Sequence, residues 1–159
     1  MTTKTIGRVI LAPRERQVVE GLADGSTLAT VARNLKIREV TAAGYLRLGK
    51  RKLHGVSENA AALAVGYATQ AITRPELLDP EGLDLSREQR NLVPLIARGM
   101  TTAQMVPELR QPVQIIRRYG RELQQSLSAK NRAHVVTRAW QYQVLTADHV
   151  IASLRGPQC

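Results

Sequence analysis

The 159-residue sequence contains no phenylalanine, one tryptophan and one cysteine. Its cores must therefore be built mainly from leucine, valine, isoleucine and alanine, which suits closely packed short helices. The single cysteine, Cys159, has no second thiol with which to form an internal disulfide or a zinc site. No apolar run approaches the roughly 20 residues of a membrane span, and the opening MTTKTIGRVILAPRER lacks the features of a secretory signal. We expect a cytoplasmic protein that makes no contact with a membrane.

The charge is strongly positive, with 23 lysines and arginines against 13 aspartates and glutamates and a formal net charge of +10. Such an excess is expected of a protein that binds a polyanion. The three histidines, His54, His134 and His149, have no cysteine or carboxylate at metal-ligand spacing. Nucleophile, phosphate-loop and dinucleotide motifs are also missing. The sequence thus predicts no metal, no cofactor and no enzymatic activity.

The sequence repeats itself at a fixed offset of 74 positions, as between Gly25 and Gly99. Other identical pairs include Leu11 with Leu85, Thr27 with Thr101, Leu35 with Leu109, Tyr45 with Tyr119, Arg47 with Arg121 and Leu53 with Leu127. We therefore predict two copies of one unit, at residues 1–72 and 85–159. The linker at residues 73–84 contains two prolines, which should make it a fairly stiff spacer.

Apolar residues recur at helical spacing throughout both copies, and no segment alternates as a half-buried strand would. The prediction is an all-α fold of two tandem four-helix units. We place helices near residues 13–23, 27–35, 38–53 and 57–72, and near 86–97, 101–110, 112–127 and 130–154. Gly49 weakens the third helix unless a close helix contact offsets its cost. Pro94 and Pro107 fall inside helices, so either those helices are distorted or the boundaries are shifted by a turn.

The last predicted helix is unusually long, and its extension carries apolar residues from Trp140 to Leu154. Two arrangements would bury them. The extension either covers the last helix of the first copy or forms the seam of a homodimer.

Two segments of the chain resemble the LuxR/GerE-type helix-turn-helix DNA-binding domain. Residues 11–19, LAPRERQVV, and 22–25, LADG, are similar to its opening pattern, L-T-P-R-E-x-E-V-L followed by L-A-x-G. Residues 127–136, LSAKNRAHVV, are similar to its closing L-G-V-x-S-R-x-E-A-V. The resemblance implies a bacterial regulator in which the second and third helices form the helix-turn-helix. It also implies that the third helix enters the major groove and that the fourth mediates dimerisation.

The family positions that contact bases map onto the third helix of each copy. In the second copy they are Arg117, Arg118 and Arg121. Arg117 and Arg121 lie one turn apart, so both guanidinium groups can reach a single groove and bond to guanine. The full set of candidate DNA-binding residues is Arg110, Gln114, Arg117, Arg118, Arg121 and Lys130 in the second copy, and Arg38, Thr41, Ala43, Gly44, Arg47, Lys50 and Arg51 in the first.

The first copy departs from the family at its base-contacting positions, where only Arg47 has a long polar side chain. Ala43 can touch a thymine methyl group and Gly44 permits close approach, while Arg38, Lys50 and Arg51 are expected to contact phosphates. The second copy would then determine most of the sequence preference.

The favoured hypothesis is a nucleoid-associated transcription regulator that binds double-stranded DNA. Its two copies would act as a covalent pseudo-dimer, with their third helices in successive major grooves about 34 to 36 Å apart. Two alternatives stay open. One is a protein-interaction module that binds RNA polymerase or another regulator, which Ala43, Gly44 and the interior prolines favour. The other is an architectural protein that coats DNA through its phosphates.

Overall fold

The computed structural model describes residues 8–154, so Cys159 and the first seven residues lie outside it. Within this range the chain forms helices and no strand, which confirms the predicted all-α class. The first four helices are α1 (Pro13–Gly21), α2 (Leu28–Leu35), α3 (Glu39–Lys52) and α4 (Asn59–Thr69). A short 3₁₀ turn, η1 (Pro80–Gly82), precedes α5 (Arg87–Ala97), α6 (Thr102–Leu109), α7 (Val113–Leu127), α8 (Arg132–Gln141) and α9 (Ala147–Leu154). None of these helices is long and apolar enough to cross a membrane.

The helices recur in the register of the sequence repeat. α5, α6 and α7 each begin 74 positions after α1, α2 and α3. The caps recur as well, because the Thr27 hydroxyl caps α2 and the Thr101 hydroxyl caps α6, each accepting from a backbone N–H three residues on. Both helices end at a left-handed residue, Lys36 with φ 58° and Arg110 with φ 54°. Equivalent sequence positions therefore adopt the same local structure in the two repeats, here numbered first (α1–α4) and second (α5–α8).

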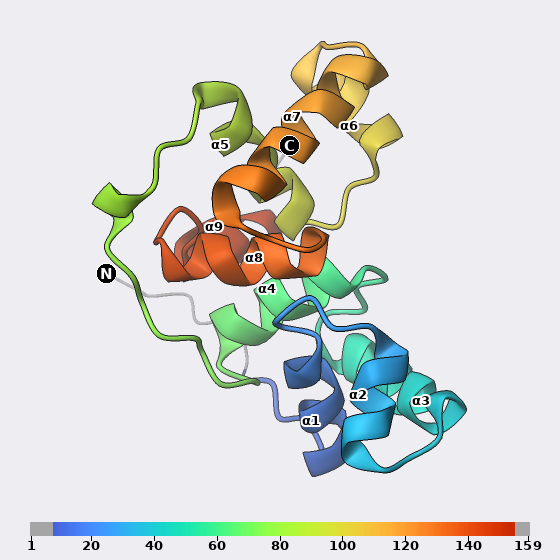
Figure 1. The fold of residues 1–159 in the computed structure, drawn as a ribbon. Coiled ribbons are helices and arrows are strands. Elements are labelled where there is room, and N and C mark those ends of the chain that lie inside the picture. The colour runs from blue at the N-terminus through green and yellow to red at the C-terminus, as the bar shows by residue number, and fades with distance from the viewer. Residues whose placement is uncertain (1–7, 155–159) are drawn as a thin grey trace.

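The centre of the molecule is formed by the fourth helix of each repeat. α4 is buried along almost its whole length, and it packs against α8, α9, α5 and α1. Figure 1 shows α1–α3 at one end of the molecule and α6–α7 at the other, with α4 and α8 between them. The buried apolar side chains of both repeats belong to one continuous cluster. The two repeats thus share a single core.

The prediction of one long helix over residues 130–154 is wrong, because the chain turns between α8 and α9. Gln143 adopts the left-handed conformation, with φ 62°. The N–H of Val144 donates to the carbonyl of Ala139 at 2.9 Å, and the N–H of Gln143 donates to that of Trp140 at 3.1 Å. These two bonds form a Schellman motif, which ends a helix. Glutamine occupies the position that glycine usually takes, so no glycine marks the end of the helix in the sequence.

The turn sends α9 back across α4, which is the first of the two arrangements expected for the C-terminal extension. Leu145 and Val150 are buried there. The apolar spacing from Trp140 to Leu154 therefore reflects two short helices that both face the core.

Pro94 and Pro107 both lie inside helices, in the last turn of α5 and of α6. α6 has the same eight-residue length as α2, which contains no proline. The proline therefore does not shorten its helix. A proline in the last turn removes one backbone donor and leaves the earlier turns intact.

The linker between the repeats is held along the surface of α8. The N–H of Leu78 donates to the carbonyl of Gln141 at 2.7 Å, and the Gln143 amide donates back to the carbonyl of Leu78 at 3.3 Å. Arg74 stacks on Trp140, with its guanidinium carbon 5.2 Å from the ring centroid, and donates to the carbonyl of Tyr67. These contacts tie the segment to both repeats, in addition to the stiffness expected from its prolines.

Candidate nucleic-acid interface

The second repeat presents α7 with one face buried and the other exposed. Ile116, Leu123 and Leu127 are buried against α5 and α6, at the three- and four-residue steps of one helix face. The opposite face carries the exposed predicted residues Gln114, Arg117, Arg118 and Arg121, and Arg110 is exposed in the turn before the helix. α7 therefore brings these five predicted residues together at one surface.

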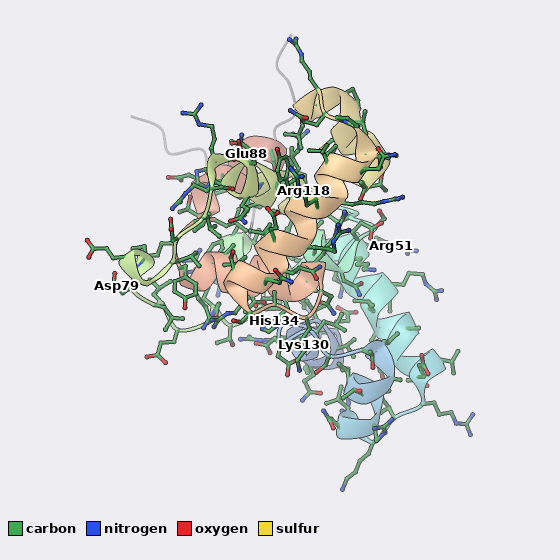
Figure 2. The ribbon with its side chains drawn as sticks, turned by 45° about the horizontal axis from the view of Figure 1, so that its top comes forward. Arg51, Asp79, Glu88, Arg118, Lys130 and His134 are labelled. Atoms are coloured by element: carbon green, nitrogen blue, oxygen red, sulfur yellow. The ribbon has the colours of Figure 1, made fainter. Side chains whose placement is uncertain are left out.

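Arg117 and Arg121 differ from Arg118 in what surrounds them. The Nε of Arg118 lies 3.8 Å from Oε1 of Glu122, and its guanidinium carbon lies 5.5 Å from the centroid of the Tyr119 ring (Figure 2). Within residues 8–154 neither Arg117 nor Arg121 takes part in an ion pair. An exposed ion pair such as Arg118–Glu122 contributes at most about 1 kcal/mol to stability, so breaking it to free the Arg118 guanidinium costs little.

The first repeat presents α3 in the equivalent position. Ala42, Leu46 and Gly49 face α1 and α2. A Cβ atom on Gly49 would lie 3.3 Å from Cγ2 of Val19, so this glycine does permit a close contact between α3 and α1. Among the predicted residues, Arg38, Thr41, Ala43, Arg47 and Arg51 are exposed and Gly44 is partly exposed.

Two lysines in the last turn of α3 are bound by the protein itself. The ammonium of Lys50, a predicted phosphate contact, donates to the carbonyl of Ser57 at 2.9 Å. Burial lowers the pKa of Lys50, and the nearby Glu58 carboxylate opposes that shift only in part. Lys52 pairs with the buried carboxylate of Glu15 at 2.8 Å. The third basic residue of this turn, Arg51, is exposed (Figure 2).

A pocket of about 510 Å³ opens beside the same turn, which the sequence did not indicate. It is lined by Arg47, Lys50 and Arg51 from α3 and by residues 55–57. The pocket is created by the loop to α4, whose position depends on contacts distant in sequence. It gives the C-terminal end of α3 a concave, positively charged flank.

The contact between the two repeats is reciprocal at its glycine turns. In a two-fold dimer, each contact from one subunit to the other has a reciprocal contact. A Cβ on Gly25 would lie 3.0 Å from Cβ of Lys130, just before α8, and one on the equivalent Gly99 would lie 3.2 Å from Cβ of Glu58, just before α4. Each repeat therefore packs its first-helix turn against the start of the other repeat's fourth helix.

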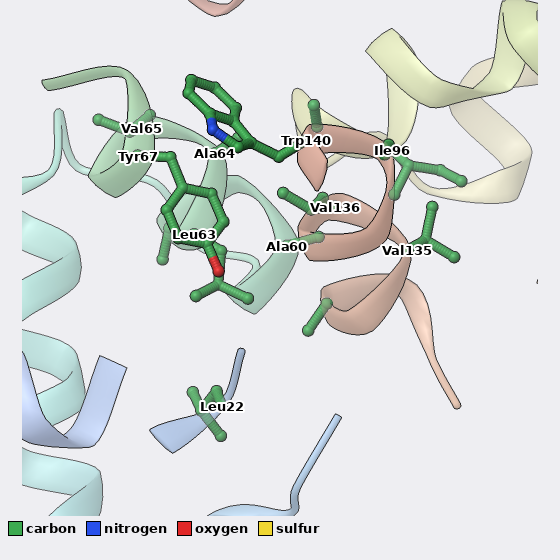
Figure 3. Close-up of a cluster of buried hydrophobic side chains, with 14 of the residues drawn as sticks. Leu22, Ala60, Leu63, Ala64, Val65, Tyr67, Ile96, Val135, Val136 and Trp140 are labelled. Carbon is green, nitrogen blue, oxygen red and sulfur yellow. The ribbon is translucent and has the colours of Figure 1, made fainter. Parts of the chain in front are cut away.

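At the centre of this contact, Tyr67 forms a buried hydrogen bond with Thr137 and packs its ring near that of Trp140. The hydroxyls of Tyr67 on α4 and Thr137 on α8 lie 2.9 Å apart, and both residues are buried. The rings of Tyr67 and Trp140 are tilted, with centroids 5.5 Å apart. Figure 3 shows Tyr67 and Trp140 within the apolar cluster that joins the fourth helices. The orientation of one repeat relative to the other is thus fixed by directional contacts as well as by apolar burial.

Lys130 lies where the two repeats meet, away from the exposed face of α7. Its N–H donates to Nδ1 of His134 at 3.1 Å, and both residues lie against Gly25 (Figure 2). Burial and the charges of Arg138 and Lys130 lower the pKa of His134, so the ring is neutral near pH 7 and its Nδ1 can accept this bond. Lys130 therefore contacts His134 and Gly25 at the junction of the repeats, which the sequence did not reveal.

Arg132 has a positioning role that the sequence analysis missed. Its guanidinium donates to the carbonyl of Met100 and to the hydroxyl of Thr102, both at 2.8 Å. These bonds tie the start of α8 to the turn between α5 and α6. The arginine of the closing motif was visible in the sequence, but its partners were not.

The described residues contain no group of three or more His, Cys, Asp and Glu side chains placed to hold a metal ion. The comparisons of the chain with models of protein families, with curated proteins and with solved structures find no match.

Proposed function

We propose that this protein is a sequence-specific regulator of transcription that binds double-stranded DNA through α7 and α3, and that it is not an enzyme. The observation that carries the proposal is the exposed face of α7. Three arginines and a glutamine lie there on one side of a helix that is anchored by its opposite side. Arginine can bond bidentately to guanine in the major groove and glutamine to adenine.

The relation between the repeats supports binding to one duplex. The reciprocal contacts at Gly25 and Gly99 support this proposal, because dimeric helix-turn-helix proteins use a two-fold relation to present two reading helices to one duplex. A rigid shared core keeps their separation fixed. The net charge of +10 adds attraction to the phosphate backbone and makes binding dependent on salt.

The proposal is tested by fluorescence anisotropy of the full chain with duplexes enriched from a random library and with an unselected duplex, between about 50 and 200 mM salt. We expect the enriched duplexes to bind at least about 1,000-fold more tightly than the unselected one. Equal affinity for all duplexes would indicate an architectural protein. Absence of binding at the lowest salt would contradict the proposal and favour a protein-interaction module.

Substitutions on α7 separate base recognition from general attraction. Arg121→Ala should weaken binding to the enriched duplex by about 5- to 150-fold and affect the unselected one far less, because a bidentate base contact contributes about 1 to 3 kcal/mol. Arg90→Ala, which removes the same charge from the exposed side of α5, is the matched control. Equal losses on both duplexes for Arg121→Ala would remove the base-reading role from α7.

A further inference from the structure

We propose that α3 reads the 5-methyl groups of thymine, so that the two repeats recognise half-sites of different composition. This inference rests on the proposed function and names what the first repeat contacts. The proposal is based on the residues in which α3 differs from α7, the equivalent helix of the second repeat.

The outward face of α3 is apolar at three positions where that of α7 is polar, although Arg47 matches Arg121. Val40, Ala43 and Gly44 occupy the positions of Gln114, Arg117 and Arg118, 74 residues on. The side chain of Val40 is 75% exposed, and Leu48 on the same side of the helix is 40% exposed. Ala43, Gly44 and Leu48 lie three, four and eight residues after Val40, so these four residues form one stripe along the helix.

Gly44 has no internal packing role. A Cβ atom on Gly44 would meet no other atom within 4 Å, whereas Gly49 on the buried side is in close contact with Val19. Glycine destabilises a helix, so Gly44 weakens α3, and no crowding within the protein requires a glycine there. What the missing side chain does provide is close access of the helix backbone to a surface outside the molecule.

The charges around the stripe indicate what that surface is. Arg38, Arg47 and Arg51 are exposed along the same face, and none of them takes part in an ion pair among residues 8–154. An occupant of this face must therefore offer negative charge next to an apolar group. In the major groove, phosphates flank the base edges, and the methyl group of thymine is the apolar group that those edges carry.

Replacing thymine by deoxyuridine tests this directly, because it removes only the methyl group. The half-site bound by α3 is the one whose sequence preference survives Arg121→Ala. In that half-site, we expect the loss of each contacted thymine methyl group to weaken binding by about four-fold. Deoxyuridine in the other half-site should have little effect. Val40→Ala should abolish the sensitivity to deoxyuridine at the position it contacts, while Leu77→Ala, a matched change at an exposed leucine of the linker, should preserve it.

The outcomes distinguish this inference from the proposed function. Tight, selective binding that ignores deoxyuridine in both half-sites would overturn the inference, leave the proposed function intact and point to a protein partner for the apolar stripe. Sensitivity that persists unchanged in Val40→Ala would also overturn it. Failure to bind any duplex would contradict the proposed function itself.

Discussion

The contact between Tyr67 and Thr137 predicts a measurable energetic coupling between the two repeats. Each hydroxyl is buried, and the 2.9 Å hydrogen bond between them joins α4 to α8. Tyr67→Phe leaves the Thr137 hydroxyl without this partner, and Thr137→Val does the same to the tyrosine. Each change should lower the free energy of unfolding by about 1 to 2 kcal/mol, because a buried polar group that loses its partner pays its desolvation cost.

The double variant should lose less than the sum of the single losses. Replacing both partners by apolar groups of similar shape removes the unpaired hydroxyl, so we expect a coupling energy of about 1 kcal/mol. For a chain of this size, 1 kcal/mol corresponds to a shift in Tm of roughly 2 to 4 °C. Urea unfolding followed by fluorescence is well suited, because Trp140 is the one tryptophan of the chain and its ring lies 5.5 Å from Tyr67. Strictly additive losses would refute the reasoning.

Three further predictions concern the scaffold. Burial raises the pKa of Glu15, but the hydrogen bonds from Lys52 and from the backbone N–H of Ala12, with the Lys52 charge, outweigh it, and the net pKa is lowered from 4.5. The stabilisation by the Glu15 carboxylate is therefore complete above about pH 4.5 and is lost as the pH falls through the pKa of Glu15 in the folded state. Glu15→Gln should make the free energy of unfolding fall less steeply at acid pH, as measured by denaturation across a pH series. Gly120→Ala should raise the unfolding free energy by about 0.5 to 1 kcal/mol, since its Cβ would meet no atom within 4 Å, and an unchanged or lower Tm would contradict this. Gly25→Ala should destabilise by more than about 1 kcal/mol, because Gly25 has φ +85° and its Cβ would lie 3.0 Å from that of Lys130; a neutral result in denaturation would show that the contact is loose.

The sequence alone predicted the parts of the fold that are specified locally. The repeat offset of 74 and the capping threonines gave the helix starts of α2 and α6 within a residue. The exposed and buried faces of α7 followed from the spacing of Ile116, Leu123 and Leu127. In these segments local propensity, capping and apolar spacing agree with one another.

The parts that it missed depend on the path of loops or on contacts between distant residues. The stop at Gln143 is a left-handed glutamine, stabilised where α9 can pack on α4. Lys50 was expected to reach a phosphate, but the loop after α3 places the carbonyl of Ser57 within hydrogen-bonding distance. The contact of Tyr67 with Thr137 joins residues 70 positions apart, and no local pattern announces it.

A hydroxyl-radical footprint on an enriched duplex shows whether both repeats bind one duplex with α3 and α7 in successive major grooves. We expect two protected regions on one face of the DNA, about one helical turn or roughly 10 base pairs apart, centre to centre. Arg121→Ala should weaken protection in one of these regions more than in the other. A single protected region, or uniform protection without boundaries, would contradict this arrangement.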